Sequence, residues 1–186
     1  MRQTETHFLQ TLDHHRIILP VRKIAYLHFI GHELSHAFDT IGSQYDKDGN
    51  VSSWWTKEDY QKFQERTNRL IDYLSSMTVD GSGKNYNGAL VQTETIADMA
   101  GIKCMLGLAA KKEDFDYDRF FRAYAYVWKK TETKEKVDAR VLTDVHALEY
   151  LGVNAVLQQF EEFYETYDIK EGDGMYLVPE DRVAVW

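Results

Sequence analysis

Two histidines four residues apart constrain this chain more than any other feature. Residues 31–39 read Gly-His-Glu-Leu-Ser-His-Ala-Phe-Asp and contain the pattern His-Glu-x-x-His. On an α-helix, residues four apart lie on one face, about one turn apart, so His32 and His36 can point two imidazoles at one metal ion. Glu33 lies about 100° around the helix from His32, beside the metal, where its carboxylate can take a proton from a bound water. The spacing predicts a site of the kind that zinc hydrolases use.

A second motif supplies the ligand that the first motif lacks. Zinc at such a site needs a third protein ligand and leaves its fourth position for water. Glu94 and Asp98 are also four residues apart and share a helix face. Glu94 is the candidate third ligand, and Asp98 can accept the free ring N–H of a ligand histidine, which fixes the tautomer and raises the basicity of that histidine. Asp39, three residues after His36, is a second candidate acceptor.

Simpler interpretations of these motifs remain. The two histidines can belong to a solvated polar helix face, Glu94 and Asp98 to a solvated acidic face, and Asp39 can be a solvated residue.

Three motifs in one order resemble the neprilysin-like zinc peptidases. They are residues 31–39, then Glu-Thr-Ile-Ala-Asp-Met-Ala-Gly at residues 94–101, then residues 173–186, which resemble the C-terminus of the bacterial oligoendopeptidase O members. The resemblance covers most of residues 17–186. It implies a thermolysin-related zincin catalytic domain with two active-site helices, one Zn²⁺ per chain, and hydrolysis of short peptides.

Residues 142–146, Leu-Thr-Asp-Val-His, resemble the Asp-x-His motif of the same family. The resemblance implies that His146 donates a hydrogen bond to the oxyanion that develops at the scissile carbonyl, which requires a donor about 3 Å from that oxygen. Asp144 then orients His146 or raises its pKa. The alternative is a surface histidine at the start of a helix.

Two positions depart from the family pattern. The arginine that the family carries six residues after the motif histidine is replaced by Gly152, and residues 7–10 lack the Asn-Ala-Tyr-Tyr motif that holds substrate. The large N-terminal region of the family is also absent from the sequence. We therefore expect a zinc-dependent endopeptidase, with a catalytically impaired zinc-binding remnant, or a fragment that needs a partner chain, as the alternative. Glu33 favours the enzyme, because a purely structural zinc does not need a general base.

Composition limits the remaining function classes. The net charge is −8 and no basic run occurs, which argues against a nucleic-acid surface. No stretch approaches the roughly 20 apolar residues of a membrane span, and no secretory signal is recognisable. The single cysteine, Cys104, lies in an apolar stretch and is expected to be buried, and Val183 stands where secreted family members carry a cysteine. These features predict a cytoplasmic protein with short peptides as partners and leave the oligomeric state open.

Periodicity predicts one domain over residues 1–186, mainly α with a small β portion. The β portion is a hairpin of strands 8–12 and 16–19, with a further hairpin at 45–51 around Asp48-Gly49. A helix from Arg22 to Thr40 carries the first metal motif, and Thr56 and Asp59 resemble a helix-capping box. The other expected elements are a loop at 78–88, helices at 90–110, 116–130 and 153–167, and a charged connector at 131–136.

Overall fold

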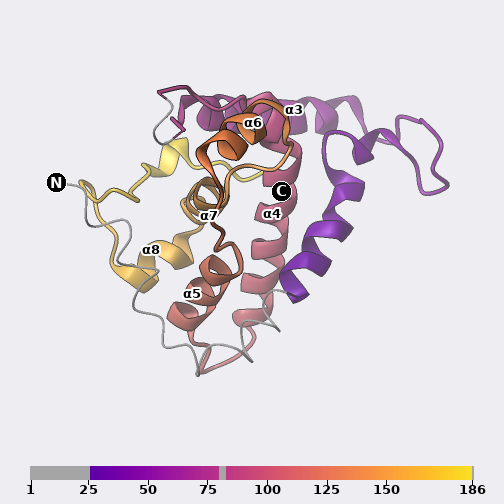
Figure 1. Ribbon diagram of the computed structural model, residues 1–186. Helices are drawn as coiled ribbons and strands as arrows, with labels where there is room; N and C mark the ends of the chain where they lie inside the picture. Colours follow the sequence, from indigo (N-terminus) through magenta and orange to yellow (C-terminus); the bar gives the residue numbers. More distant parts are fainter. Residues whose placement is uncertain (1–25, 80–82, 186) are drawn as a thin grey trace.

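The computed structural model describes residues 26–79 and 83–185, and nearly all the regular secondary structure in these ranges is helical. Residues 26–35 are helical and run directly into a short 3-10 turn. The elements that follow are η1 (His36–Phe38), η2 (Gly42–Gln44), α3 (Lys57–Ser76), α4 (Gly88–Ala109), α5 (Tyr117–Val127), α6 (Lys134–Thr143), α7 (Glu149–Leu157), α8 (Glu161–Tyr167) and η3 (Pro179–Asp181). The mainly α prediction is confirmed for the described part of the chain (Figure 1).

Extended pairing within the described ranges is limited to two isolated antiparallel bridges. One joins Tyr45 to Val51 and closes the predicted hairpin, and the other joins Thr78 to Asn85 in the predicted loop. Gly49 has φ +80°, a conformation that glycine adopts readily, so the turn forms where the sequence predicts it. The strands predicted at 8–12 and 16–19 lie outside the described residues.

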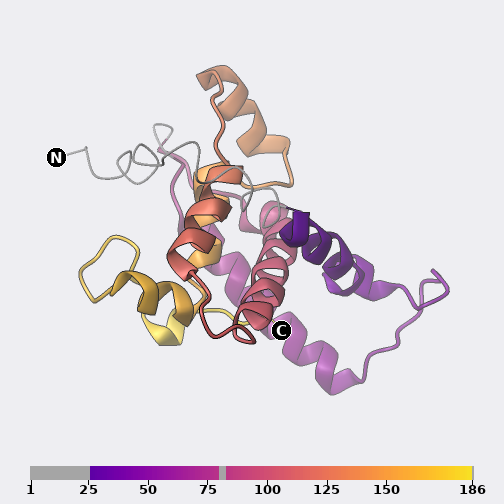
Figure 2. The same cartoon turned by 90° about the horizontal axis from the view of Figure 1, so that it is seen from below.

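Helix α4 is the centre of the fold because it is apolar on nearly all sides. Ile96 and Ile102 are fully buried, and most of the other residues of this helix are buried as well. A helix without a polar face must be covered on several sides. α3 and α7 pack against it, and residues 26–35 lie along another side (Figures 1 and 2).

Two glycines let residues 26–35 approach α4 closely. A Cβ on Gly31 would lie 3.0 Å from the Cα of Gly101, and a Cβ on Gly101 would lie 2.9 Å from the carbonyl oxygen of His28. Any larger residue at either position would push the two helices apart. This close packing at Gly101 brings the two candidate metal motifs together.

Polar caps start four of these helices. Thr56 accepts a hydrogen bond from the backbone N–H of Asp59 and donates its hydroxyl to the Asp59 carboxylate, as the Thr-x-x-Asp pattern predicts. Asn87, Asp116 and Thr133 accept in the same way at the starts of α4, α5 and α6. The helix starts are thus encoded locally in the sequence.

The predicted connector at 131–136 is wrong, because α6 begins within it. Thr133 caps the helix, and Lys134 pairs with Asp138 one turn later at 2.7 Å.

The single helix predicted over 153–167 is also wrong. Phe160 has extended backbone between α7 and α8, and the Tyr164 hydroxyl donates to the Gln158 carbonyl at 3.0 Å, which satisfies a carbonyl at the break.

The prediction that Cys104 is buried is wrong as well. Its side chain is exposed, together with Lys103, Gly107 and Leu108, on a stretch of α4 that its neighbours leave uncovered. Because α4 carries apolar residues on nearly all sides, its sequence does not indicate which side of the helix is exposed. None of the described helices combines the length and apolar character that crossing a membrane requires.

Candidate metal centre

Three acceptor atoms from two helical segments converge at one point. The Nε2 atoms of His32 and His36 lie 3.1 Å apart. The Oε2 atom of Glu94, from α4, lies 3.2 Å from the first nitrogen and 3.5 Å from the second. The structure thus brings together the three residues predicted as metal ligands.

A carboxylate stands behind each histidine. Nδ1 of His32 lies 2.9 Å from Oδ1 of Asp98, and Nδ1 of His36 lies 2.6 Å from Oδ2 of Asp39. Asp39 is held in turn by the backbone N–H groups of Ile41 and Gly42, which donate to its other oxygen at 2.7 Å each. Because an ionised carboxylate only accepts hydrogen bonds, each Nδ1 carries the hydrogen and each Nε2 can present a bare lone pair to the centre.

This donor arrangement fits a tetrahedral cation. Two imidazole lone pairs and a carboxylate that face one another at 3.1–3.5 Å repel unless a positive charge lies among them. A zinc ion holds its ligands at about 2.0–2.1 Å in tetrahedral geometry, which separates neighbouring ligand atoms by about 3.3 Å. The three observed separations bracket that value.

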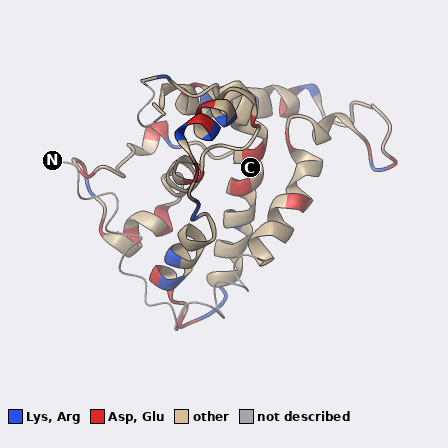
Figure 3. Cartoon of the chain, in the orientation of Figure 1, with Lys and Arg blue, Asp and Glu red and all other residues tan. Residues whose placement is uncertain are grey.

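The charges around His32, His36 and Glu94 also favour a positive charge at the point where these residues converge. Burial would lower the pKa of His32, but hydrogen bonds and attraction from Asp98 and Glu94 outweigh it and raise the pKa to about 10. The hydrogen bond with His32 lowers the pKa of Glu94 despite its partial burial. Burial would raise the pKa of Asp98, yet its contacts with His28 and His32 hold it below the ordinary value. Figure 3 shows acidic residues on α4 and on the helical segment beside it, and residues 26–44 contain no lysine or arginine.

The other predicted catalytic residues surround this centre. Glu33 is exposed on the helical turn that carries His32. Nε2 of His146, from the segment between α6 and α7, lies 3.4 Å from Oε2 of Glu94. Its Nδ1 and its backbone N–H both lie 3.0 Å from Oδ1 of Asp144. The chain thus brings the Asp144–His146 pair to Glu94, a candidate ligand about fifty residues away in sequence.

Sequence reasoning missed two residues that support this site. Nε2 of His28 lies 3.2 Å from the same Asp98 oxygen that contacts His32. Its position four residues before His32 is the signal that identifies it, since that spacing places all three histidines of the segment on one helix face. Arg140 donates from Nε to Oδ2 of Asp144 at 2.9 Å, and its position four residues before Asp144 is the signal that identifies this pair.

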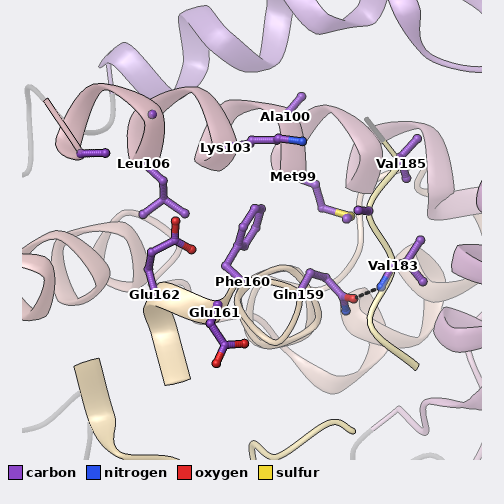
Figure 4. A pocket seen from close by; sticks show the side chains of 13 residues that line it. Met99, Ala100, Lys103, Leu106, Gln159, Phe160, Glu161, Glu162, Val183 and Val185 are labelled. Atoms are coloured by element: carbon purple, nitrogen blue, oxygen red, sulfur yellow. Dashed lines mark hydrogen bonds between the residues drawn. The ribbon is translucent and has the colours of Figure 1, made fainter. Parts of the chain in front are cut away.

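The cavity in Figure 4 is separate from this cluster. It has a volume of about 450 Å³ and lies between α4, the α7–α8 junction and the C-terminal segment. Its lining includes Met99, Leu106, Phe160, Val183 and Val185. The α4 residues in that lining lie on the side of the helix opposite Glu94 and Asp98, as the helical period requires, so the cavity contributes no atom to the metal centre.

Residues 27–183 match the sequence profile of peptidase family M13, a span that contains every candidate site residue. The chain belongs to peptidase family M13. It is 40% identical over 157 residues to the neutral endopeptidase of Lactococcus lactis subsp. lactis strain IL1403, a match that covers 84% of this chain and 25% of that protein. It is 36% identical over 172 residues to neprilysin-1 of Caenorhabditis elegans, which covers 84% of this chain and 22% of the relative.

Solved structures of M13-like proteins have the same fold over this region. PEPO from Lactobacillus rhamnosis HN001 matches with a TM-score of 0.79 at 32% identity, over 88% of this chain and 26% of that chain. The Mycobacterium tuberculosis zinc metalloprotease ZMP1, solved in complex with an inhibitor, matches with a TM-score of 0.79 at 27% identity, over 88% and 27% of the two chains. This M13 chain therefore spans about a quarter of the length of its relatives.

Proposed function

We propose that this M13 chain forms the zinc centre of an endopeptidase that hydrolyses short peptides. The observation that carries the proposal is the convergence of His32, His36 and Glu94 at ligand-to-ligand distances that suit zinc, with a carboxylate on the outer nitrogen of each histidine. A structural zinc site uses all its positions, whereas three protein ligands leave one for water or substrate.

The chemistry divides among the ion and the side chains around it. Zinc at this site supplies a Lewis acid for the scissile carbonyl and lowers the pKa of water. Glu33 accepts a proton from the attacking water and delivers it to the leaving amine. Asp98 and Asp39 keep the ligand histidines in the tautomer that frees Nε2 for the metal.

We assign the oxyanion donor to His146, whose Nε2 lies 3.4 Å from Oε2 of Glu94, and its contacts define the form in which it would act. Asp144 accepts the Nδ1–H, so His146 can donate from Nε2 only when both ring nitrogens are protonated. A positive donor beside the carbonyl favours the negative charge that develops in the transition state.

A second candidate is a fragment that needs a further polypeptide to become active. The side of the zinc-bearing segment that faces away from α4 is apolar and open to solvent, with Tyr26 and Leu34 each 69% exposed and Ile41 60% exposed. Apolar surface of this extent on one segment is typical of an interface. Gly152 also favours this second candidate, because a glycine cannot supply the guanidinium with which the arginine of the family would bind substrate.

Hydrolysis of a mixed short-peptide pool by the zinc-loaded chain, analysed by mass spectrometry, tests the proposal. Glu33→Gln keeps the size of the side chain but removes the base, and Glu113→Gln, an exposed residue between α4 and α5, is the matched control. We expect the parent and Glu113→Gln to cleave and Glu33→Gln to lose about 10²- to 10⁴-fold in rate. Equal cleavage by all three would refute the role of Glu33. No cleavage by any of them, with one zinc bound per chain, would favour the fragment.

A further inference from the structure

Among the histidines that the structure describes near the metal centre, His28 is the one that the proposed chemistry does not use. It is buried, with 1% of its surface exposed, and its Nε2 lies 3.2 Å from Oδ1 of Asp98. The same oxygen lies 2.9 Å from Nδ1 of His32. One carboxylate oxygen therefore links the buried histidine to a candidate zinc ligand.

The surroundings of His28 select one tautomer. Asp98 only accepts, so Nε2 of His28 carries the hydrogen of this bond. Nδ1 has no hydrogen-bond partner in the described part of the chain and faces Gly101, where an added Cβ would lie 2.6 Å from it. A hydrogen on Nδ1 would point at carbon with no acceptor, which is more costly than a bare lone pair there. The ring of Tyr124 lies edge-on at 5.0 Å between centroids and fixes the plane of the imidazole.

We propose that His28 is a positioning residue for the metal centre, whose Nε2–H holds the Asp98 carboxylate against Nδ1 of His32. A buried carboxylate with a single partner can rotate about its Cβ–Cγ bond, and the orientation of the His32 ring would follow it. When Nε2–H of His28 and Nδ1–H of His32 both donate to it, the Asp98 carboxylate is fixed relative to two successive turns of the helical segment. The proposal rests on the proposed function in that His32 binds zinc.

Direct hydrogen bonding accounts for this cluster better than a second metal ion. His28, His32 and Asp98 are all donor types that can bind a metal, and their nearest atoms lie close together. However, each close contact in this cluster pairs a ring N–H with a carboxylate oxygen, at 3.2 Å for His28 and 2.9 Å for His32, so hydrogen bonding satisfies these atoms without an ion. Moreover, the three residues are buried and lack an open position for exchange of a ligand.

Zinc affinity in a double-mutant cycle tests the proposal. The affinity of each chain is measured by competition with a chromophoric chelator, and circular dichroism checks that each variant folds. We expect His28→Phe to weaken zinc binding by about 3- to 10-fold, less than the 10- to 100-fold typical of a group that contacts the ligand itself. In an Asp98→Ala background the same substitution should add nothing, because its effect passes through the carboxylate. His28→Gln, which keeps an N–H, should retain most of the affinity.

An equal loss in both backgrounds would overturn the proposal and leave His28 a packing residue. An unchanged affinity of His28→Phe in the parent background would overturn it as well.

Nitrogen NMR of the labelled parent chain gives a second test that does not depend on a variant folding. The proposal predicts that His28 is protonated on Nε2 and bare on Nδ1 in the zinc-loaded protein. Protonation on Nδ1 would overturn it. If the parent binds no zinc, the proposed function fails, while the tautomer of His28 still decides whether the bond to Asp98 exists.

Discussion

Replacing Gly101 by alanine should disturb the metal centre without touching any of the three candidate ligands. The new Cβ would lie 2.6 Å from Nδ1 and 2.9 Å from the carbonyl oxygen of His28. The backbone oxygen cannot rotate away, so residues 26–35 must retreat by about half an ångström to reach the ordinary contact distance of about 3.4 Å. His32 belongs to the segment that moves and His36 follows directly after it, whereas Glu94 stays with α4.

The magnitude follows from two opposing effects. Alanine in a helix interior is favoured over glycine by about 0.5–1 kcal/mol. Overpacking of a tight contact costs about 1–3 kcal/mol. We expect Gly101→Ala to destabilise the chain by about 1–2 kcal/mol and to weaken zinc binding by about tenfold, which corresponds to about 1.4 kcal/mol.

Gly107 provides the matched control on the same helix, because a Cβ there meets no atom of the described residues within 4 Å. Gly107→Ala should stabilise the chain by up to about 1 kcal/mol and leave zinc affinity unchanged. Urea unfolding and chelator competition measure both quantities. If Gly101→Ala matches Gly107→Ala in stability and in zinc affinity, the close approach of the two segments does not hold the site together.

Three further predictions concern the groups around the centre. Asp39→Asn should weaken zinc binding by about 10- to 100-fold in a chelator competition, since it removes the charged acceptor of His36 Nδ1, and an unchanged affinity would contradict that role. His146→Phe should lower kcat by about 10²- to 10³-fold with zinc still bound, and a loss of zinc instead would make His146 a ligand. Arg140→Met should lower Tm at pH 6 more than at pH 2.5, because the Arg140 guanidinium helps to lower the pKa of Asp144. Burial would raise this pKa, but the backbone N–H of His146 and the guanidinium bring it to about 2. A depressed carboxyl pKa stabilises the fold fully above its unfolded value near 4, and that stabilisation is lost as the pH falls toward 2, so a Tm difference that does not shrink would refute the contribution.

Helical periodicity accounts for what could be predicted from the sequence. A spacing of four residues fixes His32 with His36, and Glu94 with Asp98, on common faces regardless of the rest of the fold. The capping pattern at Thr56 is equally local. These features depend on neighbours within one helical turn.

The remaining features depend on contacts between distant segments. His28 lies in an apolar stretch, and its partner Asp98 is seventy residues away. The charges around Arg140 resemble a solvated connector, yet Glu132, Asp144 and Glu149 all contact its guanidinium, and α6 forms around that cluster. The spacing of four residues favours the Arg140–Asp144 pair, but no local signal marks Glu132 and Glu149 as the other partners of this guanidinium.

X-ray absorption at the zinc edge of the loaded chain tests the central claim most directly. The account predicts one zinc per chain with two imidazole nitrogens, one carboxylate oxygen and one further light atom at about 2.0–2.1 Å, and a strong loss of zinc affinity in Glu94→Ala. A sulfur atom at about 2.3 Å would place the metal on Cys104, the single cysteine. That result, or an unchanged zinc spectrum in Glu94→Ala, would contradict the assignment of His32, His36 and Glu94 as the ligands.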